Sequence, residues 1–140
     1  MAIRLSRYRA RMIRAHARET YPDECCGALL GEVNAEGKWV RSHRRLDNVH
    51  EDGHRRRFRV DPYALMLVEK EARAQGMKVL GFYHSHPDHP AVPSEYDRTH
   101  AWPGYSYIIV SSRPGRTGRM TSWIIEDEGA PFTQEEIERE

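Results

Sequence analysis

Residues 84–97 read HSHPDHPAVPSEYD and concentrate imidazole and carboxylate groups in a short stretch. Imidazole nitrogens and carboxylate oxygens are ligands that zinc takes from proteins. A catalytic zinc site needs three such ligands and one open position for water. The stretch therefore predicts a metal site. The competing interpretation is a strand that runs into a capped helix and binds nothing.

His84 and His86 supply two of the three ligands. Side chains alternate along a strand, so both imidazoles point to the same face, with Cα atoms roughly 6.6 Å apart. The apolar run VLGFY places the pair at the carboxyl end of a buried strand, where an open sheet often leaves a cleft. Candidates for the third ligand are Asp88 and His89, which follow at once, and Asp97, which lies beyond a loop stiffened by prolines.

Ser94 and Asp97 also have a purely structural interpretation. A serine at a helix start with an acidic residue three positions later stabilises the first turn. A lone His-x-His pair likewise lies more often on a surface or in a core than on a metal. The structural interpretation weakens because both features occur together across one proline-rich loop.

The elements around this stretch form a mixed pattern of helices and strands. Apolar residues recur at helical spacing over 5–20, and Asp61-Pro62 opens a second helix that Gly76 closes. A short helix is expected from Ser94. Thr133 with Glu136 resembles a capping box for another short helix. Strands are expected at 27–33, 38–46, 55–60, 79–86, 105–112 and 122–127, with a polar segment at 47–54.

Composition favours one globular domain over residues 1–140, of α/β or α+β class, with a mixed β-sheet flanked by helices. Hydrophobic residues make up 39% of the 140 residues, and the net charge of +1 argues against a polycation that seeks nucleic acid. The arginines between positions 41 and 59 form either a solvated face or a surface for an acidic partner.

Cysteine usage and apolar runs predict a cytoplasmic protein. Cys25 and Cys26 are adjacent, and disulfide geometry disfavours a bridge between neighbours, so a reducing compartment is expected. We expect both to pack in the core, although one of them near the metal would be able to modulate it. No signal peptide or membrane span is recognisable.

Two metal-site families share parts of the pattern. The letters His84-x-His86-x-Asp88-His89 resemble the signature of the metallo-β-lactamase superfamily. That superfamily has further histidine and aspartate ligands far downstream in a longer chain, whereas no histidine follows His100 here. We therefore regard a metallo-β-lactamase-like hydrolase as a less favoured alternative.

A longer pattern is similar to the JAMM motif of the MPN+ (JAB-domain) zinc metalloproteases. The motif is His84-Ser85-His86, then Ser94 and Asp97, and the upstream segment PDECCG resembles the one that carries the catalytic glutamate of that family. Similarity continues in RFRVDP, VLGFYHSHP and AWPGYSYIIVS, so it spans roughly residues 5–125. The compact prokaryotic members of the family are the most similar.

This resemblance implies an MPN (JAB/cytidine-deaminase-like) fold and a set of residue roles. His84, His86 and Asp97 are implied as ligands of Zn²⁺, Glu24 as the general base and Ser94 as the group that stabilises the oxyanion. The implied reaction is hydrolysis of the amide or isopeptide bond after the C-terminal Gly-Gly of a ubiquitin-like protein. For compact prokaryotic members that partner is often a β-grasp sulfur-carrier protein.

Two non-enzymatic alternatives remain. One is an MPN scaffold that binds protein partners without catalysis, although such relatives usually lack the metal ligands that are intact here. The other is a nucleic-acid-binding module that uses the arginines at 41–59, which near-neutral net charge disfavours. We expect no nucleic acid and no membrane among the partners, and the sequence leaves the oligomeric state open.

Overall fold

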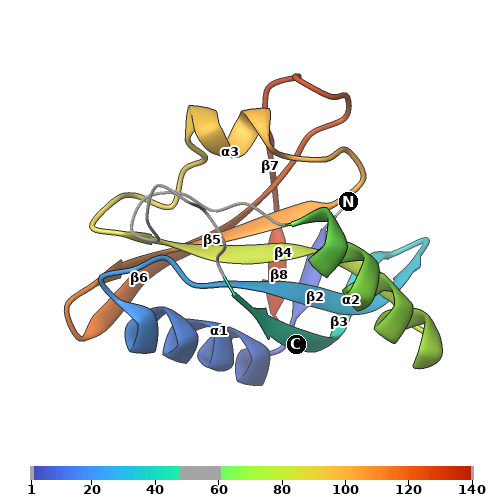
Figure 1. The fold of residues 1–140 in the computed structure, drawn as a ribbon, viewed down its shortest axis with the longest axis horizontal. Coiled ribbons are helices and arrows are strands. Elements are labelled where there is room, and N and C mark those ends of the chain that lie inside the picture. Colours follow the sequence, from blue (N-terminus) through green and yellow to red (C-terminus); the bar gives the residue numbers. More distant parts are fainter. Residues whose placement is uncertain (1, 48–60, 140) are drawn as a thin grey trace.

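The computed structural model describes residues 2–47 and 61–139. Its centre is an eight-stranded sheet with the strand order β7-β6-β5-β4-β2-β3-β1-β8 (Figure 1). The helices are α1 (Arg7–Thr20), α2 (Pro62–Ala74) and α3 (Glu95–Thr99). The strands are β1 (Ile3–Leu5), β2 (Cys26–Asn34), β3 (Gly37–Leu46), β4 (Lys78–Pro87), β5 (Ser106–Arg113), β6 (Arg116–Ile124), β7 (Thr133–Glu135) and β8 (Ile137–Arg139).

Strand β4 lies in the middle of the sheet and has a partner on each side. It runs antiparallel to β2, with Cys26 opposite His84, and parallel to β5, with His86 opposite Ser111. Parallel and antiparallel pairs therefore occur within one sheet. The predicted mixed sheet flanked by helices is confirmed.

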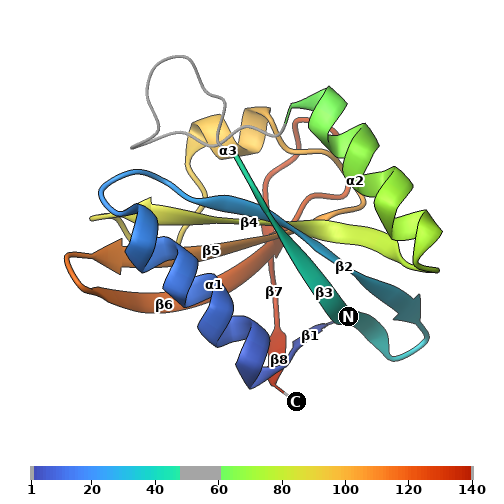
Figure 2. The same ribbon diagram turned by 60° about the horizontal axis from the view of Figure 1, so that its bottom comes forward.

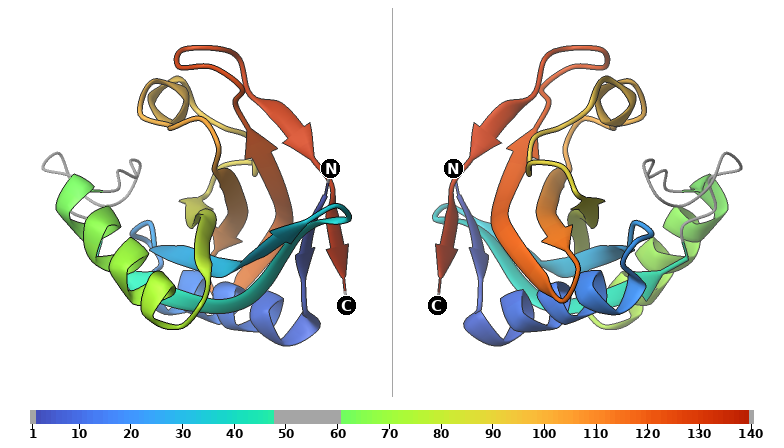
Figure 3. Two further views of the ribbon diagram at one scale, coloured as in Figure 1. Left: turned by 90° about the vertical axis from the view of Figure 1, so that its right-hand side faces the viewer. Right: turned by 90° about the vertical axis from the view of Figure 1, so that its left-hand side faces the viewer.

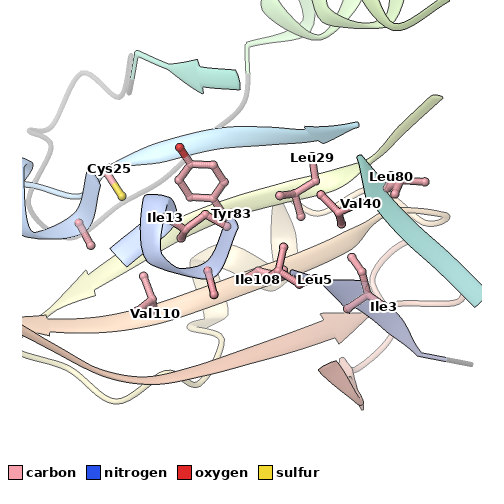
Figure 4. Packing of buried hydrophobic residues seen from close by; sticks show 12 residues of the cluster. Ile3, Leu5, Ile13, Cys25, Leu29, Val40, Leu80, Tyr83, Ile108 and Val110 are labelled. Carbon is pink, nitrogen blue, oxygen red and sulfur yellow. The ribbon is translucent and has the colours of Figure 1, made fainter. Parts of the chain in front are cut away.

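Helices cover both faces of the sheet. Ala10, Ile13 and Ala17 of α1 pack in one apolar cluster with Leu29 and Tyr83. Figure 4 shows Tyr83 and Cys25 beside Ile13. On the other face, α2 packs on β2 and β4 in a second cluster that contains Val68, Ala72, Leu30 and Phe82. Figure 2 shows α1 across β5 and β6, with α2 and α3 on the other side of β4.

Side-chain alternation at the start of β2 divides the two cysteines between these clusters. Cys25 belongs to the cluster under α1, and Cys26 to the cluster under α2. Both are free and buried, as predicted for core residues. Burial raises the pKa of the Cys25 thiol to about 11 and also raises that of Cys26, so both stay protonated at neutral pH.

The C-terminal segment joins the two ends of the sheet. β7 pairs with β6 at one end, and β8 pairs with β1 at the other, while the Ile3 N–H donates to the Glu136 carbonyl at 3.0 Å. Figure 3 shows how the sheet curves to bring these ends together. The predicted short helix at Thr133 is therefore wrong. Backbone pairing with two open strand edges outweighs a single marginal helical turn.

Other boundaries also differ from the sequence predictions. Residues 3–5 form β1, and α1 starts two residues later than predicted, with Ser6 accepting a hydrogen bond from the Arg9 N–H at 3.1 Å. β6 starts at Arg116, before the predicted strand at 122–127, because its polar outer half pairs with β5 but lacks the apolar alternation that predicts a strand. Asp61 flanks α2 but makes no side-chain cap. The predicted strand at 55–60 and residues 48–54 lie outside the described residues.

Among residues 2–47 and 61–139, no helix is both long enough and apolar enough to cross a membrane.

Candidate metal centre

Two imidazoles meet at the carboxyl end of β4. Strand alternation directs His84 and His86 to the face of the sheet on which α3 lies, and both side chains are buried. Their Nε2 atoms are 3.1 Å apart. The sequence prediction that both imidazoles point to the same face is confirmed by this geometry.

Helix α3 brings a carboxylate to the same point. The Oδ2 atom of Asp97 lies 3.4 Å from the His84 Nε2 and 3.1 Å from the His86 Nε2. Asp97 is placed by a capping box, in which Ser94 Oγ accepts from the Asp97 N–H at 3.0 Å and Asp97 Oδ2 accepts from the Ser94 N–H at 2.9 Å. The structural interpretation of this pair is therefore confirmed, and the same carboxylate oxygen that caps α3 also faces both imidazoles.

The spacing of these three atoms matches a metal ligand set. Ligand atoms at about 2.0–2.2 Å from a tetrahedral zinc lie roughly 3.3–3.6 Å from one another, close to the 3.1–3.4 Å found here. The His86 Nδ1 lies 2.9 Å from the Pro90 carbonyl oxygen. A carbonyl only accepts, so Nδ1 carries the proton and the lone pair of Nε2 points into the centre. Lone pairs that converge in this way repel one another unless a cation lies between them.

The protonation states favour metal binding. Burial lowers the pKa of His84, so its imidazole is neutral at pH 7. Burial alone would raise the pKa of Asp97, but the adjacent His84 and His86 hold it well below its usual range. Neutral imidazole and ionised carboxylate are the forms in which these groups bind metal ions.

Glu24 completes the centre from the segment between α1 and β2. It precedes Cys26 by two residues, so its side chain lies on the same face as the histidines. Single atoms of Glu24, His84 and His86 lie within 4.8 Å of one another. The side chain is 3% exposed, and neither carboxylate oxygen has a hydrogen-bond partner among the described residues.

The surroundings of Glu24 favour its protonated form. Burial, followed by the charge of Asp97, raises the pKa of Glu24 to about 9. A cation held by the nearby ligand atoms would act in the opposite direction, because it favours the carboxylate. A group whose proton affinity depends so strongly on its neighbours is suited to moving a proton.

Ser85 joins the two segments that carry these groups, and the sequence analysis assigned it no role. Its Oγ accepts a hydrogen bond from the Cys25 N–H at 2.8 Å, and its own N–H donates to the Cys25 carbonyl at 3.2 Å. Ser85 therefore fixes the backbone beside Glu24 to the strand between the two histidines. Strand alternation predicts that Ser85 points to the face opposite His84 and His86. This is the feature of the sequence that indicates a supporting role for Ser85.

A pocket of about 230 Å³ opens beside the centre. Ser94 Oγ accepts from the Asp97 N–H, which leaves the hydroxyl proton of Ser94 free to donate. All five predicted site residues, Glu24, His84, His86, Ser94 and Asp97, are thus brought together. The pocket is lined by Glu24, His86, Pro87, His89, Pro90, Val92 and Ser94.

Asp88 and His89, the other candidate ligands, do not belong to the cluster of possible metal-binding side chains in the described part of the chain. Both carboxylate oxygens of Asp88 accept from the Tyr21 hydroxyl, at 2.9 and 2.8 Å. His89 is exposed and lines the pocket. The pattern that suggested a metallo-β-lactamase therefore has its last two members, Asp88 and His89, outside the group formed by His84, His86 and Asp97.

The described arginines of the basic segment are paired within the chain. Arg41 contacts Glu32 at 3.1 Å, Arg45 contacts Glu19 at 2.6 Å, and Arg44 contacts Glu71. These ion pairs support the interpretation of a solvated face. Arg55, Arg56, Arg57 and Arg59 lie outside the described residues.

Comparison with known proteins gives matches over most of the chain. The model of the family described as prokaryotic homologs of the JAB domain matches residues 7–126. The chain is 37% identical over 115 residues to a desampylase of Haloferax volcanii, covering 79% of this chain and 78% of the relative. It is 28% identical over 114 residues to the CysO-cysteine peptidase of Mycobacterium tuberculosis, covering 81% and 75%.

Solved structures show the same architecture. A protein of Desulfitobacterium hafniense superposes with a TM-score of 0.84 at 33% identity, covering 99% of this chain and 92% of the other. A JAB1/MPN domain protein from Archaeoglobus fulgidus superposes with a TM-score of 0.59 at 24% identity, covering 98% and 96%, and this likeness shows the fold alone.

Proposed function

This chain belongs to the family of prokaryotic homologs of the JAB domain, and from that membership we propose that it is a zinc-dependent metallopeptidase. The bond it hydrolyses is the amide or isopeptide bond after the C-terminal Gly-Gly of a ubiquitin-like, β-grasp sulfur-carrier protein. The names of the relatives, a desampylase and a CysO-cysteine peptidase, support a peptidase of this class.

One observation carries the proposal. The Nε2 atoms of His84 and His86 and the Oδ2 of Asp97 lie within 3.4 Å of one another, beside the buried Glu24 carboxyl group that has no hydrogen-bond partner among the described residues. A core that served stability alone would give the buried Glu24 carboxyl group hydrogen-bond partners. Their convergence next to a pocket supports a site that is completed by a metal and a substrate.

His84, His86 and Asp97 would hold the zinc. When bound, zinc polarises an amide carbonyl and lowers the pKa of water. Glu24 takes the proton of the attacking water and returns it to the departing amine, since no hydrogen bond within the described chain competes for its oxygens. Ser94 donates its hydroxyl proton to the oxyanion that develops on the carbonyl oxygen.

The pocket supports a substrate that ends in an unbranched tail. Prolines and a valine form much of its wall, and the Glu24 carboxyl group that lines it is buried. Glycine residues bring no side chain, so a Gly-Gly tail lets the scissile amide approach the buried Glu24 closely. We also propose a cytoplasmic location, since Cys25 and Cys26 are both free thiols, which a reducing compartment preserves.

The activity is tested with β-grasp sulfur-carrier proteins that are extended after Gly-Gly by cysteine, by a lysine side chain or by a short peptide. Mass spectrometry should find one cut, after the second glycine, that a chelator stops and added zinc restores. A matched panel whose last two residues are alanine should be cut more slowly. Complete inactivity across the panel would favour a scaffold that binds partners without catalysis.

The metal assignment is tested separately from activity. Purified protein should contain about one zinc per chain, as three ligands and one open position imply. The double variant His84→Ala, Asp97→Ala should lose it, whereas His89→Ala should keep it. Retention of zinc by the double variant, measured by elemental analysis after dialysis, would show that the ligands lie elsewhere.

A further inference from the structure

The loop that follows β4 contains a carboxylate that takes no part in the ligand set. Asp88 is the first residue after β4, and its N–H donates to the Ser112 carbonyl at 2.7 Å. Its φ of 58° makes it the one non-glycine residue in the left-handed region within the described ranges. Aspartate tolerates that region better than most residues, but an unfavourable conformation persists only where surrounding contacts determine it.

Tyr21 provides one of those contacts from the end of α1. Its hydroxyl donates to both Asp88 oxygens, at 2.9 and 2.8 Å. Tyr21 caps α1 through its N–H, which donates to the Ala17 carbonyl at 3.2 Å, and Ala17 is packed in the core. The phenol therefore extends from the end of a helix that is fixed against the sheet.

Glu24 lies between two contacts, and both of them join the segment that follows α1 to the carboxyl end of β4. Its own oxygens make no hydrogen bond within the described chain, so its position depends on the backbone that carries it. On one side, Cys25 is tied to Ser85 of β4. On the other side, Tyr21 is tied to Asp88, just beyond the end of β4. Anchors on both sides of Glu24 restrict how far the segment can shift relative to the histidines.

We propose that Tyr21 and Asp88 form a clamp that positions Glu24 over the three ligand atoms. Both are positioning residues, since neither lines the pocket or belongs to the ligand set. The inference rests on the proposed function, because the position of Glu24 matters to the rate only if Glu24 moves a proton. A displacement of about 1 Å at a catalytic group is able to cost roughly 100-fold in rate. Loss of one exposed hydrogen bond should cost less, roughly 10-fold.

The kinetic test uses Tyr21→Phe, which removes only the phenol oxygen, and Asp88→Gly, which keeps the left-handed backbone but removes the carboxylate. Each should lower kcat roughly 10-fold without changing KM or zinc content, and the double variant should be no slower than either single variant. Asp88→Asn retains one acceptor and should recover part of the loss. Tyr63→Phe, at an exposed tyrosine on α2, is the matched control and should behave as wild type.

A second measurement does not depend on activity. Hydrogen exchange of the Cys25 and Asp88 amides, which donate to Ser85 and Ser112, should become faster in Tyr21→Phe and stay unchanged in Tyr63→Phe. The absorption spectrum of the cobalt-substituted protein should not change, because the ligands are untouched. Unchanged exchange at Cys25 overturns the clamp, and so does a changed cobalt spectrum. If wild type cleaves nothing, the proposed function fails while exchange still decides the clamp.

Discussion

Two carboxyl groups are buried to the same extent in this molecule and have opposite surroundings. Glu24 is 3% exposed and Glu135, on β7, is 4% exposed. Neither oxygen of Glu24 has a hydrogen-bond partner within the described chain. In contrast, Glu135 Oε1 accepts from the hydroxyls of Ser106 and Ser122, at 2.8 and 2.9 Å, and its Oε2 accepts from the Lys38 ammonium at 3.1 Å.

The difference separates a structural carboxylate from a chemical one. The four residues Lys38, Ser106, Ser122 and Glu135, here named the Glu135 cluster, satisfy one another from β3, β5, β6 and β7 and need nothing from outside. At the candidate metal centre, the carboxyl group of Glu24 has no hydrogen-bond partner among the described residues, which leaves its oxygens available to water and substrate. Burial alone therefore does not mark a functional site, whereas burial without satisfaction does.

Glu24→Gln should produce the largest change in rate. The amide keeps the size of the side chain but cannot take a proton, so cleavage after Gly-Gly should fall by roughly 100- to 10,000-fold. Zinc content should be unchanged, and the free energy of unfolding should not decrease, because no hydrogen bond within the described chain is lost. Steady-state kinetics measure the rate, and elemental analysis of the same preparation measures the zinc content. A variant that stays active would show that Glu24 is not the general base.

Ser94→Ala tests the oxyanion donor at the same centre. Losing one such donor typically costs roughly 100- to 1000-fold in kcat. The alanine also removes the cap of α3, so Ser94→Thr, which keeps both the hydroxyl and the capping ability, is the matched control. Recovery of most of the rate by threonine is expected. If the rate of Ser94→Ala stays within a few-fold of the wild-type rate, groups other than Ser94 stabilise the oxyanion.

Glu135→Gln should show the reverse behaviour to Glu24→Gln. The substitution leaves the Lys38 ammonium without its carboxylate in a buried place, so the free energy of unfolding should fall by about 3 kcal/mol. The kcat of the folded fraction should not change. Chemical denaturation followed at two wavelengths measures the free energy of unfolding. Equal stability of Glu135→Gln and the wild type would contradict the distinction between the Glu135 cluster and the candidate metal centre.

A smaller, pH-dependent effect is expected from His16, which is buried and bonded to the Tyr83 hydroxyl at 2.7 Å. Burial, followed by the charge of Arg45, lowers the pKa of His16 to about 4. The unfolded chain therefore binds this proton more tightly than the folded one. Stability from this group is full above pH 6.5 and is lost as pH falls towards 4, by at most about 3 kcal/mol. The same slope in His16→Gln would show that other groups are responsible.

Residues close together along the chain were predictable. The alternation of a strand places His84 and His86 on one face, and the Ser94–Asp97 spacing predicts a helix start that turns a carboxylate back towards them. The placement of Glu24 beside them came from the family resemblance, because it depends on how β2 pairs with β4. Composition and periodicity do not contain that pairing.

The features that sequence reasoning missed are those that depend on distant partners. The Thr133–Glu136 pattern suggested a helix, but the segment that follows pairs with β1, from the opposite end of the chain, while Thr133–Glu135 pairs with β6. The Glu135 cluster draws its members from four strands and has no local signature. Ser85 and Asp88 likewise act through contacts with the segment 21–25, which only the folded chain brings within reach.

The double use of the Asp97 Oδ2 has a thermodynamic consequence. The same oxygen accepts the Ser94 N–H at the start of α3 and faces the two imidazoles. Metal binding and the ordering of this five-residue helix are therefore linked equilibria, and each must favour the other by the same free energy. Helices so short are marginal by themselves. Under the proposed roles, loss of the metal would also loosen the segment that carries Ser94, so that the ligand set and the oxyanion donor would be assembled or lost together.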